Sequence, residues 1–167
     1  MISVNSLSGA FGVRKLTESD AEAIFHLCLD NTLYYQYCKA EPTMGQILHD
    51  LYITPPGIGE DRKYYVGFYR EHELIAVMDL IDGYPREDMA FIGFFMVRAA
   101  AQHQGIGSGI ISDTADYLKR MGKRSIQLGI DQGNPQSKAF WKKNGFQVLK
   151  EVEIDGGVIL LAERTLV

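Results

Sequence analysis

Hydrophobic positions along this chain predict a sheet of short strands separated by amphipathic helices. The runs 64–69 and 74–80 are rich in aromatic and aliphatic residues, and the polar segment 70–73 between them predicts an antiparallel hairpin. The run 90–97 is apolar without interruption, which indicates a buried central strand. Similar runs predict further strands at 11–16, 125–130, 147–154 and 158–166, the last two joined by a turn at 155–157.

Apolar residues at helical spacing predict about four helices. The first begins at a predicted capping box, residues 19–22. A second helical region, 32–52, should break at 41–42, because a proline restricts the residue before it. The element order predicts a single α/β (α+β) domain, 1–167, with a mostly antiparallel central sheet of about six or seven strands. The remaining helices are expected at 110–121 and 135–144.

Length and composition suit one globular domain with one sizeable core. Residues 1–10 are small and polar, which predicts a loose leader. Neither a membrane-spanning run nor a signal-peptide pattern is visible, so we expect no membrane partner and a cytoplasmic location. The only cysteines, Cys28 and Cys38, lack Cys-x-x-Cys spacing, which favours reduced thiols. The four histidines are scattered, so no metal site is expected.

Charge is unevenly distributed along the chain. Residues 98–143 carry 8 basic and 3 acidic side chains, whereas residues 1–97 carry 7 basic and 14 acidic ones. The basic segment would attract a polyanion, and the acidic half would suit a cationic substrate. Ordinary surface charge explains the acidic half equally well. The net charge of −4 argues against nucleic acid as a partner.

A glycine-rich turn at 102–109, Gln-His-Gln-Gly-Ile-Gly-Ser-Gly, lies between the apolar run 90–97 and the predicted helix. Such a turn points backbone N–H groups and the positive end of a helix dipole at one spot, which favours a phosphate or pyrophosphate. A dinucleotide fingerprint would need a third glycine at Ile110, and a nucleotide-kinase loop would need a Gly-Lys-Ser/Thr ending. Neither is present, although a glycine-rich helix start without a ligand stays open.

The turn fits the pattern Gln/Arg-x-x-Gly-x-Gly/Ala, and a second block follows at 134–146, Asn-Pro-Gln-Ser-Lys-Ala-Phe-Trp-Lys-Lys-Asn-Gly-Phe. Both blocks, in this order, resemble the GNAT superfamily of acyl-CoA-dependent N-acetyltransferases. The specific resemblance covers about residues 90–146, and the rest of the chain matches in element order. It implies a GNAT fold, acetyl-CoA as cofactor and, as is common in such folds, a homodimer.

The resemblance also implies roles for particular residues. In the family, the turn binds the pyrophosphate of coenzyme A, and the central strand pairs with the pantetheine arm. A backbone N–H near Val97 would face the thioester oxygen. Asn134 would bind the pantetheine or merely cap the helix after it, and the aromatic side chains of that helix would line the cofactor or pack in the core. The expected cofactor-binding residues are Phe95, Met96, Val97, Gln102, His103, Gln104, Gly105, Ile106, Gly107, Ser108, Asn134, Ser137, Phe140 and Trp141.

Two catalytic side chains common in the family are absent. Trp141 stands where a tyrosine often protonates the leaving thiolate, and an indole has no suitably acidic proton. Phe91 stands where some members carry a glutamate base. The base must therefore come from elsewhere, or from water, and the thiolate can leave unassisted. Candidate bases near the ends of the middle strands are Asp79, Asp82, Tyr84 and Asp88, for each of which turn capping is the alternative.

The resemblance therefore implies an enzyme that moves an acetyl group from acetyl-CoA to a primary amine of a small molecule or peptide. The two missing side chains keep open a non-catalytic acyl-CoA-binding module, and a longer acyl group is a third alternative. Tyr34, Tyr35 and Tyr37 form either a half-buried helix face or part of a substrate pocket.

Overall fold

The computed structural model describes residues 1–38 and 40–167. Its centre is a seven-stranded sheet in the order β1-β2-β3-β4-β5-β7-β6. Neighbouring strands are antiparallel except β4 and β5, which are parallel. The strands are β1 Gly12–Lys15, β2 Lys63–Arg70, β3 Glu73–Asp82, β4 Met89–Val97, β5 Ser125–Asp131, β6 Gln147–Ile154 and β7 Gly157–Thr165. The predicted mixed sheet and α/β fold class are confirmed.

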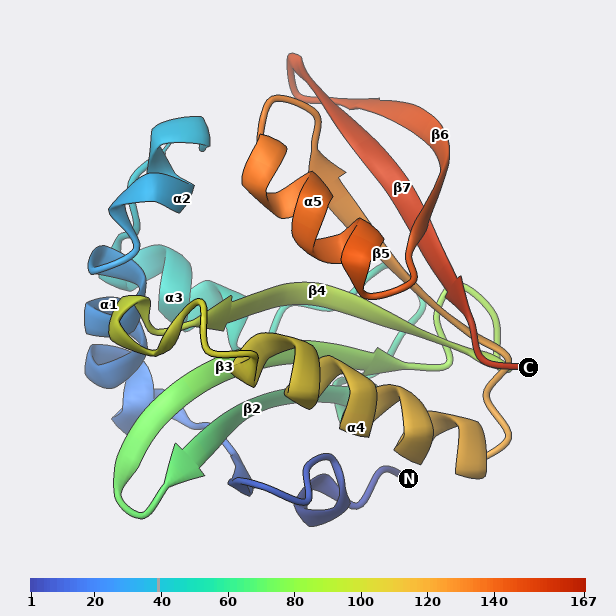
Figure 1. The fold of residues 1–167 in the computed structure, drawn as a ribbon, viewed down its shortest axis with the longest axis horizontal. Helices are drawn as coiled ribbons and strands as arrows, with labels where there is room; N and C mark the ends of the chain where they lie inside the picture. Colours follow the sequence, from blue (N-terminus) through green and yellow to red (C-terminus); the bar gives the residue numbers. More distant parts are fainter. Residues whose placement is uncertain (39) are drawn as a thin grey trace.

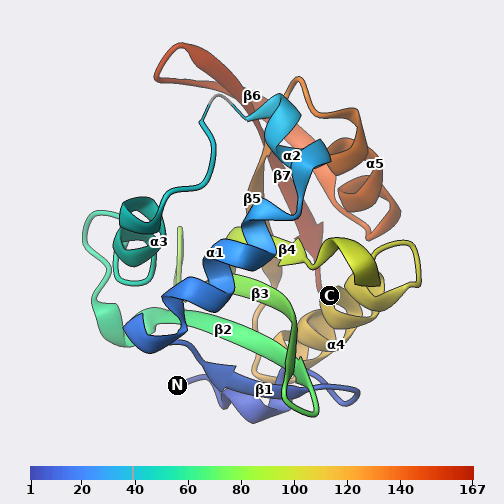
Figure 2. The same ribbon diagram turned by 90° about the vertical axis from the view of Figure 1, so that its left-hand side faces the viewer.

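Helices cover both faces of the sheet, and α3 and α4 lie on opposite sides of it (Figure 2). The described residues form five α-helices where about four were expected, because the region 32–52 yields two separate short helices. The capping box also differs, since Thr17, the other candidate cap beside Ser19, forms it with Asp20, two residues earlier than predicted. The helices are α1 Ala21–Leu29, α2 Thr32–Tyr37, α3 Met44–Asp50, α4 Ile106–Arg120 and α5 Pro135–Lys143.

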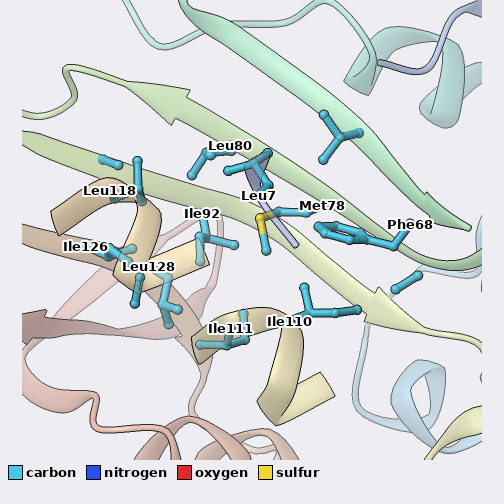
Figure 3. Packing of buried hydrophobic residues seen from close by; sticks show 14 of the residues in the cluster. Leu7, Phe68, Met78, Leu80, Ile92, Ile110, Ile111, Leu118, Ile126 and Leu128 are labelled. Carbon is cyan, nitrogen blue, oxygen red and sulfur yellow. The ribbon is translucent and has the colours of Figure 1, made fainter. Parts of the chain in front are cut away.

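Two hydrophobic clusters fill the space on either side of the sheet. The larger lies between the sheet and α4 and α5, where Met78, Ile92 and Ile111 interlock (Figure 3). The smaller lies between the sheet and α1 and α3. Side chains alternate along β4 with a shift at Gly93, the extra residue of a bulge, so that Ile92 and Phe95 contact the first cluster and Phe94 contacts the second. We call these the α4 face and the α1 face of the sheet.

The first ten residues are not the loose leader that their composition predicts. Leu7 is fully buried and lies within the α4-face cluster (Figure 3). The segment is also tied down by hydrogen bonds, because Thr114 Oγ1 donates to the Leu7 carbonyl at 3.3 Å and the Ser3 N–H donates to the Tyr117 hydroxyl at 2.7 Å. Isolated apolar residues in a polar segment carry no periodicity, so the sequence pattern missed this packing.

Candidate functional site

The sheet opens between its two central strands. β4 and β5 pair only from Met89 to Ile92 and from Ser125 to Leu128. Beyond this point β4 continues to Val97, while β5 stays paired along its whole length with β7 (Figure 1). A bulge at Gly93 accompanies the separation, since Asp79 on β3 pairs with Phe94 and the next residue pairs with Ile92. The far end of β4 therefore has no strand on one side within the described residues.

Backbone groups of β4 face this opening. The Arg98 N–H donates to the Ile75 carbonyl on β3 at 2.8 Å. Because backbone groups of an antiparallel pair alternate in direction, the N–H groups of Phe95 and Val97 point away from β3, toward the opening. Met96 was expected to bind the cofactor, but its backbone points to β3 and its side chain is buried on the α1 face. The structure thus places the backbone of Phe95 and Val97, but not that of Met96, at the opening.

At one end of the opening, α4 begins without a capping side chain among the described residues. Its N-cap is Gly105, whose φ of +78° favours glycine and lets the helix start four residues earlier than predicted. By contrast, α5 is capped by Asn134 and α3 by Thr43. The first-turn N–H groups of a helix have no partner within it and carry the positive end of its dipole. The start of α4 is therefore suited to an anion.

Side chains of the glycine-rich turn hold its shape. Gln102 Nε2 donates to the Val97 carbonyl at 2.8 Å and also to Asn31 Oδ1, which ties the turn to β4 and to the end of α1. Gln104 Nε2 donates to the Ala100 carbonyl at 3.2 Å. His103 has a φ of +62°, in the left-handed region. The Gln102 and Gln104 side chains thus stabilise the turn and leave the first-turn N–H groups of α4 for a ligand.

Gly107 lies too close to its neighbours to carry a side chain without displacing them. A Cβ there would lie 3.2 Å from the Phe140 ring and 3.3 Å from Val97. Phe140 in turn stacks on Phe95 with 6.1 Å between ring centroids, and Trp141 lies 5.9 Å from the same ring. Gly107 therefore allows the start of α4 to pack closely on α5 and β4. Of the other turn residues, Ile106 packs on the α4-face cluster, and Ser108 Oγ accepts a bond from Asn144 Nδ2 at 3.2 Å.

Asn134 and Trp141 are both buried in the structure. The Asn134 side chain is 2% exposed, and its Oδ1 accepts the Ser137 N–H at 3.0 Å, so the helix-capping role is real. Trp141 is 7% exposed and contacts Phe140 and Phe146 edge-on, at centroid distances of 4.9 and 5.1 Å. These contacts give Trp141 a packing role.

A cavity of about 280 Å³ lies in the opening and is lined from both faces of the sheet. We call it the opening cavity. Trp141 and Ser137 of α5 line it on the α4 face, whereas Tyr34 of α2 lies with Phe94 on the α1 face. Of the two alternatives for the tyrosine cluster, Tyr34 thus fits the pocket, whereas Tyr37 is 40% exposed. The full lining is Tyr34, Phe91, Ile92, Gly93, Phe94, Phe95, Leu128, Gly129, Asp131, Ser137, Trp141 and Ile159.

Sequence reasoning missed Asp131 and Gly93. Asp131 ends β5 and lines the opening cavity, and Cys38 Sγ lies 3.8 Å from its Oδ2. An acidic residue directly after an apolar strand run was a weak signal for this position. Gly93 was hidden inside a run that we interpreted as an uninterrupted strand, although an isolated glycine in a strand often marks a bulge.

The three candidate aspartates lie at different places relative to the opening between β4 and β5. Asp82 pairs with Ala90, where β4 and β5 are closed, and its Oδ1 lies 2.5 Å from Lys123 Nζ. Asp88 precedes β4 at the same closed end, and its bond to Arg86 lowers the pKa of its carboxyl. Asp79 alone of the three lies beside the open part of β4, opposite Phe94.

Asp79 is a buried carboxylate with only one of its two oxygens paired among the described residues. It is 8% exposed, its Oδ2 pairs with Lys63 Nζ at 2.9 Å, and its Oδ1 has no hydrogen-bond partner among the described residues. A Cβ at Gly93 would lie 2.7 Å from Asp79 Oδ2, so the carboxylate sits directly against the bulge. Burial raises the pKa of Asp79, and the charge of Lys63 opposes this shift. Burial also raises the pKa of the Tyr34 hydroxyl, which keeps it protonated.

Comparison with known proteins identifies the fold and the family. A sequence model described as the acetyltransferase (GNAT) family matches residues 24–146. The chain belongs to this family. No curated protein matches the chain. An acetyltransferase from Thermus thermophilus has a TM-score of 0.75 at 21% identity, covering 93% of this chain and 97% of that one.

Two further similar structures were determined with the cofactor. The PaiA N-acetyltransferase from Thermoplasma acidophilum, in complex with coenzyme A, has a TM-score of 0.68 at 17% identity, covering 93% of this chain and 98% of that one. The YncA protein from Salmonella typhimurium, with its cofactor acetyl-CoA, has a TM-score of 0.63 at 17% identity, covering 93% of this chain and 94% of that one. At these identities the likeness shows the shared fold.

Two other findings concern only the described residues. They contain no helix long and apolar enough to span a membrane. They also contain no group of three or more His, Cys, Asp or Glu side chains arranged to hold a metal ion.

Proposed function

We propose that this protein transfers the acetyl group of acetyl-CoA to a primary amine of a small molecule or peptide. The observation that carries the proposal is the uncapped start of α4 at one end of an opening between two central strands. An anion-binding helix start beside an unpaired strand edge suits a ligand with a pyrophosphate at one end and an amide-rich arm at the other. Membership of the acetyltransferase (GNAT) family supports the same conclusion.

The residues at the opening divide the work of holding the cofactor. The backbone N–H groups at 106–108 would bind the pyrophosphate, with the turn held in place by Gln102. The backbone of Phe95, at the unpaired edge of β4, would bind the pantetheine amides as a strand would, because the Val97 carbonyl already accepts bonds from Gln102 and Asn31. Bound acetyl-CoA supplies an acetyl group activated as a thioester. The Val97 N–H would then stabilise the negative charge that develops on the carbonyl oxygen.

Asp79 is the residue that we propose as general base. An incoming ammonium must lose a proton before it can attack, and Asp79 lies against Gly93 at the opening with one unpaired oxygen. Its pKa is raised by burial, which increases its affinity for a proton. Lys63 positions the carboxylate and limits the rise in its pKa. Asp79 would take the proton directly or through one water molecule.

The leaving thiolate needs no proton donor from residue 141. Trp141 is buried among Phe95, Phe140 and Phe146 and contributes packing rather than a proton. A thiol has a pKa of about 8.5, so a thiolate leaves readily near neutral pH without a protein acid. Cys28 and Cys38 are both free thiols, which fits a protein of the reducing cytoplasm.

The test is amine-dependent release of free thiol from acetyl-CoA, measured with amines of different classes. We expect thiol release that requires both substrates and an acetylated amine detectable by mass spectrometry. Saturable coenzyme A binding with no amine-dependent release would instead support the second candidate, a non-catalytic acyl-CoA-binding module. Phe91 and Trp141, which replace two common catalytic side chains, favour that candidate.

A further inference from the structure

Asp131 lies across the opening from the free part of β4. The last β4–β5 pair is Ile92 with Leu128, so Asp131 and Phe95 each stand three residues beyond it on diverging strands. Leu128 and Ile130 contact the α4-face cluster, which turns Asp131 to the α1 face. Its carboxylate lies near Cys38, next to α2. Asp131 is therefore positioned to meet a substrate that reaches the opening from the α1 face.

An aromatic wall stands beside Asp131 on the same face. Tyr34 packs edge-on against Phe94 with 6.3 Å between ring centroids, and Phe91 packs edge-on against Tyr84 at 5.4 Å. Tyr34, Phe91 and Phe94 all line the opening cavity, together with the aliphatic Ile159 of β7. Aromatic faces attract both apolar groups and cations. This wall would accept an apolar group attached to an ammonium.

The charge of the residues that line the cavity limits how many positive charges a substrate can carry. Among the described residues that line it, Asp131 is the only charged one. A polyamine or aminoglycoside carries several ammonium groups, and each would need a carboxylate or water to replace its hydration. The cavity volume of about 280 Å³ also lies at the lower end for ligand pockets, and the pantetheine arm would take part of it. The lining thus suits a small molecule with one positive charge.

We propose that the acceptor is a monocationic primary amine with a compact aromatic or apolar body, and that Asp131 holds its ammonium group. This inference rests on the proposed function and names the class of amine. Asp131 binds and orients the amine, whereas Asp79, behind the Gly93 bulge, takes its proton. The two carboxylates should therefore affect different kinetic constants.

The experiment compares 2-phenylethylamine with spermidine as acceptors, using wild type, Asp131→Asn and the control Asp116→Asn. Asp116 is exposed on α4, so its variant removes the same charge far from the α1 face. We expect 2-phenylethylamine to be the better substrate in kcat/KM. Asp131→Asn should raise its KM about 10- to 100-fold, the scale of one charge-assisted hydrogen bond, and leave the KM for acetyl-CoA unchanged. Asp116→Asn should match wild type.

Binding is measured in parallel by calorimetric titration of each amine into the protein with coenzyme A bound. Preference for spermidine, or an unchanged KM in Asp131→Asn, would overturn the inference while leaving acetyl transfer intact. Thiol release with neither amine, together with tight 2-phenylethylamine binding that Asp131→Asn abolishes, would overturn the proposed function and support the ligand class. Absence of 2-phenylethylamine binding would overturn the inference by itself.

Discussion

The C-terminal part of β3 carries two buried ion pairs, at Asp79 and Asp82, that look alike and have different surroundings. Lys63 and Asp79 pair at 2.9 Å, and Lys123 and Asp82 pair at 2.5 Å, with every side chain at most 12% exposed. Each lysine also donates to a backbone carbonyl, and the second pair lies where β5 covers the edge of β4. The first pair lies beside the part of β4 that is not paired with β5, and Asp79 lies against the bulge at Gly93.

We propose that this difference separates a buried charge that stabilises the fold, at Asp82, from one that acts in catalysis, at Asp79. At the closed end, where β4 and β5 are paired, the ion pair joins β3 to the segment between α4 and β5. At the open end, a ligand can reach the bulge against which Asp79 rests. A buried pair is weak evidence for stability in itself, because desolvation offsets the attraction. The predictions below therefore separate rate from stability at the two ends.

The largest expected effect is a fall in kcat in the Asp79→Asn variant. Loss of a general base should lower kcat about 10²–10⁴-fold, and the acidic limb of the pH–rate profile should disappear. In wild type the unprotonated carboxylate is the active form, so the rate should fall as the pH drops through the raised pKa of Asp79. Steady-state kinetics across pH measure both effects.

Asp82→Asn is the matched control for that rate. It makes the same change three residues away on the same strand, at the closed end. We expect kcat within a few-fold of wild type for the folded variant. Equal losses in the two variants, or an acidic limb that persists in Asp79→Asn, would remove Asp79 from the mechanism.

Stability should respond strongly at the closed end. Lys123→Met leaves Asp82 buried without its partner, which typically costs about 3–5 kcal/mol in the free energy of unfolding. Urea denaturation monitored by circular dichroism measures this cost. The double variant Lys123→Met with Asp82→Asn should recover much of it, since no uncompensated charge remains. A single variant as stable as wild type would show that solvent reaches Asp82.

Asn134→Ala tests the open end of the β4–β5 pair, where a side chain caps the start of α5 and none caps the start of α4. Loss of the bond to the Ser137 N–H should destabilise the protein by about 1 kcal/mol. If the side-chain amide also binds pantetheine, acetyl-CoA affinity should fall by about 1–2 kcal/mol. Calorimetry and thermal unfolding separate the two effects, and unchanged affinity would leave Asn134 with capping alone.

The smallest effect is expected for Trp141→Phe. A phenyl ring keeps most of the contacts with Phe95 and Phe146, so kcat should change no more than a few-fold. The basic limb of the pH–rate profile should also be unchanged, because Trp141 transfers no proton. A large fall in kcat with KM unchanged would instead assign the indole N–H a role in the transition state.

Local patterns predicted the strands, most of the helices and the glycine turn, because each follows from periodicity within a short window. The opening between β4 and β5 has no such signature, and only the resemblance of 102–109 and 134–146 to a known family implied it. Tyr34 and Asp131 line the opening cavity from distant parts of the chain, and Asp79 lies against Gly93 of the same lining, so no local pattern could show these placements. Leu7 was missed for the same reason, since its burial depends on α4.

The central claim is that the uncapped start of α4 and the open edge of β4 bind coenzyme A, and calorimetric titration with coenzyme A tests it most directly. The titration uses wild type, Gly107→Val and Gly109→Ala, since a Cβ at Gly109 would meet nothing within 4 Å whereas Gly107 packs against Phe140 and Val97. We predict tight binding to wild type and Gly109→Ala, and a large loss of affinity in a Gly107→Val protein that still unfolds cooperatively. Near-normal binding by folded Gly107→Val, or none by wild type, would contradict the account.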